Sequence, residues 1–81
     1  MKIHSPKERY NLCGLNLREF RKERELSQDA LAAKVRAAGH NVTQKSISRM
    51  ETGKQIVTDY EIKYLAEALD ITVCQLLGLK E

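Results

Sequence analysis

Four polar side chains in one short segment have the chemistry to recognise the edges of base pairs. They are Gln44, Lys45, Ser48 and Arg49. Gln can form two hydrogen bonds to an adenine edge, and Lys or Arg can bind O6 and N7 of guanine. Residues three and four apart are neighbours on a helix, so these side chains would lie along one side of it. The pattern predicts a helix that reads bases in the major groove; the alternative is a surface helix whose polar side chains are only solvated.

Local signals define where this helix begins and ends. Thr43 is a suitable N-cap, because its hydroxyl can accept a hydrogen bond from the amide near Ser46. Ile47 and Met50 are three residues apart and share one inward face. Gly53 can end the helix in a left-handed conformation. The polar side chains must therefore point away from the core.

A second capped helix precedes this one. Ser27 is its N-cap, Leu31 and Val35 belong to its apolar face, and Gly39 can end it. Two short amphipathic helices joined by a glycine-containing turn have the layout of a helix-turn-helix, whose second helix enters the major groove.

The distribution of charge fits a polyanionic partner. Residues 1–54 carry 12 Lys and Arg against 6 Asp and Glu, whereas residues 55–81 carry 2 against 5. The net charges of the two parts are therefore +6 and −3. This asymmetry predicts a basic face toward DNA and an opposite face left for water or protein.

Taken together, these motifs resemble the Cro/C1-type (XRE) helix-turn-helix family, which includes the phage repressors and many small bacterial regulators. The resemblance is carried by residues 17–28, 31–32, 43–54, 57–61 and 65–69. It implies an all-α fold, a compact five-helix bundle of the lambda-repressor-like DNA-binding type. It also implies sequence-specific binding to double-stranded DNA and a role as a transcriptional regulator that acts as a repressor.

The chain departs from the family pattern between the two helices. The family's turn is short, typically a Gly and a hydrophobic residue, whereas residues 36–41 stand between Val35 and Val42 here. Arg and Ala are good helix formers. We therefore expect an extra turn on the first of the two helices, ended by Gly39 and followed by a lengthened turn.

The resemblance extends to residues outside the base-reading segment. Gln28 would bond a phosphate or brace Gln44, and Lys54 matches the family's phosphate-contacting lysine. Arg21 would form a structural ion pair with Glu51 and hold the first helix against the recognition helix. The full set of candidate phosphate-binding residues is Gln28, Thr43, Lys54, Arg18 and Lys22. For Arg18 and Lys22, the alternative is a solvated face of mixed charge.

Hydrophobic spacing predicts the remaining helices and a single core. A first helix is expected over residues 15–25. Thr58 and Glu61 form a capping box for a helix that ends at Leu69, and Thr72 caps a short last helix. The side chains expected to point inward are Leu17, Phe20, Leu26, Leu31, Val35, Val42, Ile47, Met50, Val57, Ile62, Leu65, Leu69, Val73, Leu76 and Leu77.

The sequence offers no catalytic residues and no signature of an enzyme. There is no glycine-rich phosphate loop, no HExxH zinc motif and no pair of carboxylates with a credible pocket. Cys13 and Cys74 are far apart in sequence and outside any metal-binding spacing, so we expect two partly buried small hydrophobes. No metal and no cofactor is therefore predicted.

We expect residues 1–11 to form an N-terminal arm that need not be rigid and residues 12–79 to form the helix-turn-helix domain. No stretch is apolar enough to span a membrane, and the N-terminus lacks the apolar region of a signal peptide, which predicts a cytoplasmic protein. Family members commonly bind DNA as homodimers, and here the last helix or the N-terminal segment would supply the dimer surface.

A protein-interaction module, such as an antitoxin that binds a protein partner, is the alternative function. RNA binding is a weaker third option, because the chain lacks an aromatic platform for stacking bases.

Overall fold

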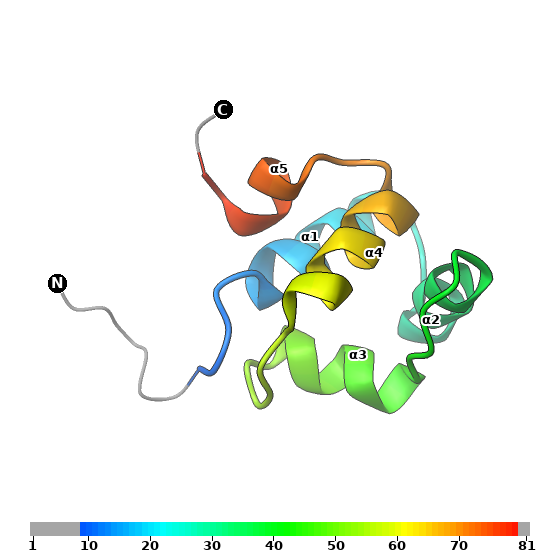
Figure 1. Cartoon of the computed structure of the whole chain (residues 1–81), viewed down its shortest axis with the longest axis horizontal. Coiled ribbons are helices and arrows are strands. Elements are labelled where there is room, and N and C mark those ends of the chain that lie inside the picture. Colours follow the sequence, from blue (N-terminus) through cyan, green and yellow to red (C-terminus); the bar gives the residue numbers. More distant parts are fainter. Residues whose placement is uncertain (1–8, 80–81) are drawn as a thin grey trace, which may run out of the picture.

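The computed structural model describes residues 9–79, which form five helices in one bundle (Figure 1). They are α1 (Gly14–Glu23), α2 (Gln28–Ala37), α3 (Gln44–Glu51), α4 (Asp59–Leu69) and α5 (Val73–Leu77). The helix α2 packs against α3 and α4, and α1 packs against α3, α4 and α5. In Figure 1, α3 and α5 lie on opposite sides of the bundle. The predicted all-α, five-helix fold is confirmed.

Hydroxyl N-caps begin four of the helices, at the residues that the sequence predicts. Ser27 Oγ accepts from the Ala30 amide at 2.9 Å, and Thr43 Oγ1 accepts from the Ser46 amide at 3.1 Å. Thr58 and Thr72 begin α4 and α5, and both belong to complete capping boxes. These helices begin where expected because a cap satisfies backbone amides locally, whatever the rest of the fold does.

The end of α1 differs from the prediction. The helix ends at Glu23 rather than at residue 25, and Glu25 has a left-handed backbone conformation with φ 56°. The amide of Glu25 donates to the Lys22 carbonyl, and the Leu26 amide donates to the Arg21 carbonyl. This is the Schellman pattern of helix termination, which usually has glycine at the left-handed position.

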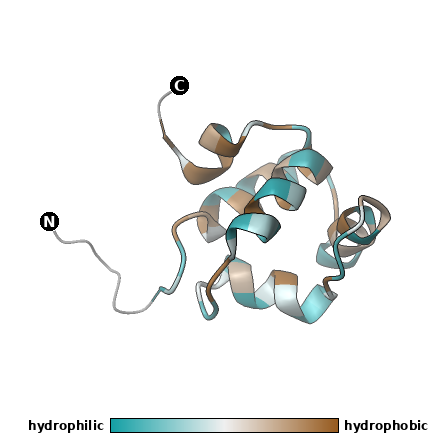
Figure 2. Cartoon of the chain, in the orientation of Figure 1, coloured by the Kyte–Doolittle hydropathy of each residue, from teal (hydrophilic) through white to brown (hydrophobic). Residues whose placement is uncertain are grey.

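The core is formed by apolar side chains from all five helices and the connecting segments. The buried ones are Cys13, Leu17, Leu31, Ala32, Val35, Val42, Ile47, Met50, Leu65, Ala66, Leu69 and Leu76. One predicted core residue was wrong: Val73 is 42% exposed. It is the first residue of the single turn α5, where Leu76 is the buried side chain. Figure 2 shows mixed hydropathy along the longer helices and a mostly hydrophobic α5.

The two cysteines differ in burial. Cys13 is completely buried beside α1, more so than expected, and Cys74 is partly exposed; both are free thiols. Burial raises the pKa of the Cys13 thiol above its ordinary value. The side chain is therefore a neutral part of the core.

The lengthened turn has the predicted form. The helix α2 continues through Arg36 and Ala37, and Gly39 follows with φ 114°. Arg36 Nη1 donates to the Val42 carbonyl at 2.9 Å, which holds the turn closed on itself. Val42 is consequently buried and α3 remains packed on α2.

None of the helices between residues 9 and 79 is both long enough and apolar enough to cross a membrane.

Candidate nucleic-acid interface

The helix α3 has one buried side and one exposed polar side. Ile47, Met50 and Glu51 are buried against the other helices. The outer side carries Gln44, Lys45 and Arg49, all exposed, with Ser48 half-buried beside them. The four side chains that could read bases therefore belong to the side that is not packed in the core.

A buried ion pair joins α3 to α1. Arg21 Nε and Nη2 donate to Glu51 Oε2 and Oε1 at 2.6 and 3.0 Å, and Arg21 Nη1 donates to the Leu26 carbonyl at 2.7 Å. The hydrogen bonds to the Glu51 carboxylate raise the pKa of Arg21 above its ordinary value, so the guanidinium stays charged. A bidentate Arg–carboxylate pair fixes orientation as well as distance, and it sets how α3 lies on α1.

A chain of side-chain amides extends this pair to the start of α3. Gln28 Nε2 donates to Glu51 Oε1 at 3.0 Å, and Gln44 Nε2 donates to Gln28 Oε1 at 2.6 Å. Of the two contacts that the family resemblance offers for Gln28, the bracing of Gln44 is present in the structure. The first residue of α3 is thus oriented by a hydrogen-bonded chain that begins at a buried charge.

The turn that follows α3 gathers further polar groups. Arg49 Nε donates to Gln55 Oε1 at 3.3 Å, and Arg49 Nη2 lies 3.5 Å from the Lys54 carbonyl. Within residues 9–79, neither Lys45, Arg49 nor Lys54 has a carboxylate partner. No carboxylate in this part of the chain therefore neutralises their positive charges, which suits contact with phosphates or with guanine edges.

Residues 9–11 hold the end of α3, a role that the sequence analysis missed. Asn11 Nδ2 donates to the carbonyls of Met50 and Gln55, both at 2.9 Å. Its Oδ1 accepts from the Gly14 amide at 2.8 Å, so Asn11 also satisfies the first amide of α1, whose N-cap residue is Cys13. Asn is a common turn residue before a helix, but the contact of Asn11 with the Met50 carbonyl joins residues 39 apart in sequence, which no local signal indicates.

The family model described as helix-turn-helix matches residues 17–76, from the first turn of α1 to α5. The chain belongs to this family, of the Cro/C1 (XRE) type. No curated protein and no solved structure shows significant similarity to the chain. Family membership makes this a DNA-binding helix-turn-helix domain, in which α3 occupies the place of the recognition helix.

The two basic residues proposed on α1 stand apart from the recognition helix. Arg18 and Lys22 are exposed and one turn apart. Neither forms a side-chain hydrogen bond or an ion pair with α3 in the described part of the chain. The structure thus brings Gln28, Gln44, Arg49 and Lys54 into one neighbourhood around α3 and leaves Arg18 and Lys22 as separate surface cations.

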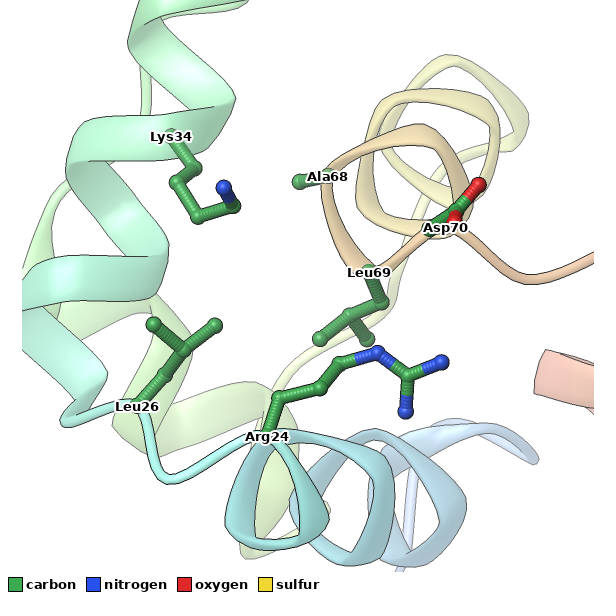
Figure 3. A pocket seen from close by; sticks show the side chains of 6 residues that line it. All are labelled: Arg24, Leu26, Lys34, Ala68, Leu69 and Asp70. Carbon is green, nitrogen blue, oxygen red and sulfur yellow. The ribbon is translucent and has the colours of Figure 1, made fainter.

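A shallow depression of about 270 Å³ lies away from the recognition helix (Figure 3). Lys34 of α2 and Ala68 of α4 lie on opposite sides of it, and Arg24, Leu26, Leu69 and Asp70 complete its lining. The Leu69 side chain has no exposed surface, so it gives a ligand little to contact. None of the six lining residues belongs to α3.

Within residues 9–79, His, Cys, Asp and Glu side chains form no group of three that could hold a metal ion.

Proposed function

We propose that this protein is a sequence-specific transcriptional regulator that inserts α3 into the major groove of double-stranded DNA and acts as a repressor. The exposed side of α3 is the observation that carries the proposal. It presents Gln44, Lys45 and Arg49, whose chemistry matches adenine and guanine edges. The opposite side is fixed through Glu51 to the buried guanidinium of Arg21.

Base reading and phosphate anchoring fall to different side chains in this proposal. Gln44, Lys45, Arg49 and Ser48 contact bases. Thr43 and Lys54 flank the recognition helix and contact phosphates, with Arg18 and Lys22 as further cations for the backbone. Gln28 acts mainly by orienting Gln44, since both ends of its amide already have partners. A brace of this kind reduces the side-chain entropy lost on binding.

A homodimer on DNA is part of the proposal. Asn16 Nδ2 donates to the Leu76 carbonyl at 3.1 Å, which places the first turn of α1 beside α5. Leu12, Leu15 and Leu79 belong to this region, and each is more than half exposed. Exposed leucines near one another are suited to burial against a second copy. Two copies would place their recognition helices in half-sites about one helical turn, roughly 34–36 Å, apart.

A DNA-binding regulator must be in the compartment that contains its DNA. We therefore propose that the protein is located in the cytoplasm.

Selection of bound sites from random duplex DNA tests this function. We expect enrichment of a palindromic consensus, since two copies related by a two-fold axis read the same half-site twice. Lys34→Ala removes a cation from the depression away from α3 and should select the same consensus. The double variant Gln44→Ala/Lys45→Ala should lose it. If the unmodified protein enriches no consensus sequence, sequence-specific binding is rejected.

A protein-interaction module, such as an antitoxin, is the second candidate. The exposed apolar side chains Leu12, Leu15 and Leu79 favour it, because a heterologous partner could cover them as well as a second copy. The polar outer side of α3 argues against a protein-interaction module, since a partner-binding helix would expose apolar residues there. The molar mass measured by light scattering distinguishes the two functions. The mass of a homodimer supports the DNA-binding proposal, and the mass of a monomer supports binding of a different protein to this surface.

A further inference from the structure

The segment before α1 is bound to the end of the recognition helix by four hydrogen bonds to backbone carbonyls. Arg9 Nη2 donates to the Glu51 carbonyl at 2.9 Å, and the Tyr10 amide donates to the Gly53 carbonyl at 2.8 Å. Asn11 Nδ2 supplies the other two, to Met50 and Gln55. Figure 1 shows this blue segment beside the connection between α3 and α4. We call residues 9–11 the strap.

The strap changes the electrostatics of this helix end. The last carbonyls of a helix have no intrahelical partner and form the negative end of its dipole. A DNA phosphate brought close to such carbonyls would be repelled. The strap covers the carbonyls of Met50 and Glu51 with donors, and one of these donors belongs to a guanidinium. The Met50 carbonyl also accepts from the Gly53 amide, so the charge added at the end of α3 comes from the Arg9 guanidinium on the Glu51 carbonyl.

Three cations lie around the turn that the strap holds. The side chain of Arg9 lies against Gly53, where a Cβ would be 2.8 Å from its Cγ and Cζ. Arg49 Nη2 reaches the Lys54 carbonyl at 3.5 Å, and Lys54 itself is exposed in the turn. Glu51, the carboxylate nearest in sequence to Arg49 and Lys54, is already paired with Arg21 and Gln28. The arrangement suits an anion with several oxygens, such as a phosphodiester.

We propose that the strap and the turn of residues 53–55 together form a phosphate-binding element for the DNA backbone beside the C-terminal end of α3. In this element Arg9 contacts a phosphate directly. Asn11 is a positioning residue, because it holds the turn through two carbonyls and reaches no phosphate itself. The inference rests on the proposed DNA binding and adds two residues that lie outside the helix-turn-helix match.

The salt dependence of binding to a short labelled duplex of mixed sequence, long enough for one protomer, tests the role of Arg9. Each phosphate neutralised contributes about −0.9 to the slope of log K against log salt concentration. Arg9→Ala should therefore reduce the steepness of the slope by about 0.9, measured by fluorescence anisotropy between roughly 50 and 200 mM salt. Lys34→Ala removes the same charge away from α3 and should leave the slope unchanged. Equal slopes for Arg9→Ala and the unmodified protein would overturn the proposal.

Asn11→Ala tests the positioning role. It removes no charge, yet we expect a lower affinity and a less steep salt slope, because the turn no longer holds its phosphate contact in place. Asn16→Ala is the matched control, since it removes a similar amide-to-carbonyl hydrogen bond that goes to Leu76 of α5 and not to the end of α3. Circular dichroism establishes that each variant is folded. A slope unchanged in folded Asn11→Ala would reject a positioning role.

The outcomes also separate this inference from the proposed function. If the unmodified protein binds the mixed-sequence duplex with the Arg9-dependent slope but selects no consensus, the phosphate-binding element stands and sequence-specific regulation fails. If it selects a consensus and Arg9→Ala has no effect on the slope, regulation stands and the element is rejected. Absence of any binding to duplex DNA would reject both.

Discussion

The imidazole ring of His40 lies parallel to the phenol ring of Tyr64, with ring centroids 5.1 Å apart and planes 9° apart. This stack joins the lengthened helix-turn-helix turn to α4. Glu61 supports the same contact: its Oε2 lies 3.9 Å from His40 Nε2, and its Oε1 accepts from the Thr58 amide at 2.8 Å. His40 of the lengthened turn is therefore held by Glu61 and Tyr64 of α4.

Removing the His40 ring should destabilise the fold without abolishing it. Stacked ring pairs contribute about 0.5–1.5 kcal/mol beyond the area they bury. We expect His40→Ala to lower the free energy of unfolding by at least this amount in urea denaturation. His40→Phe keeps a ring over Tyr64 and should recover most of the loss. The neighbouring Asn41 is exposed, and Asn41→Ala should have no effect. Equal stability of His40→Ala and the unmodified protein would show that the stack contributes nothing.

Breaking the Arg21–Glu51 pair should be far more damaging. The Glu51 side chain is 2% exposed, so Arg21→Ala leaves a carboxylate buried with Gln28 as its remaining side-chain partner. Loss of one member of a buried pair costs about 3–5 kcal/mol, which is a large fraction of the stability of a small domain. The control is Lys63→Ala, which breaks the exposed Lys63–Glu67 pair. We expect no measurable change in the urea midpoint for this control, and a similarly small change for Arg21→Ala would contradict the assigned role.

Glycine in place of Glu25 should stabilise the protein. Glu25 has φ 56°, a left-handed conformation that costs a residue with a Cβ roughly 1 kcal/mol. Glu25→Gly removes this strain and should raise the melting temperature. Six residues earlier, Glu19→Gly places glycine at an exposed position in the middle of α1 and should lower stability by about 1 kcal/mol. Thermal unfolding should therefore show melting-temperature changes of opposite sign in the two variants. A lower melting temperature in both would contradict the prediction.

Arg49 and Lys54 should differ in what their loss does to DNA binding. Arg49→Ala should cost about 1–3 kcal/mol on the preferred site and relax the preference at one base pair. Lys54→Ala should weaken binding to all sequences alike and reduce the steepness of the salt slope by about 1. Competition between the selected site and a mismatched duplex distinguishes the two effects. Unchanged binding in both variants would reject these contacts.

Local sequence was sufficient to predict the capped helices and the polar side of α3. Ser27, Thr43, Thr58 and Thr72 begin their helices because each hydroxyl or capping box satisfies amides within its own first turn. The extra turn of α2 was predictable for the same reason, since helix-forming residues continue it until Gly39. The family resemblance supplied the pairing of Arg21 with Glu51, which local patterns do not contain.

Long-range packing decided the features that local sequence could not. The strap residue Asn11 contacts Gln55, which is 44 residues away in sequence, and His40 stacks on a ring in α4. The exposure of Val73 likewise depends on how α5 meets its neighbours, whereas the left-handed Glu25 belongs to a local helix termination that has no glycine to signal it. Capping and periodicity act within one or two turns of a helix, whereas these contacts exist only once α1, α3 and α4 have docked. The chain thus specifies its recognition helix locally, but the orientation of that helix and the charge at its end come from tertiary packing.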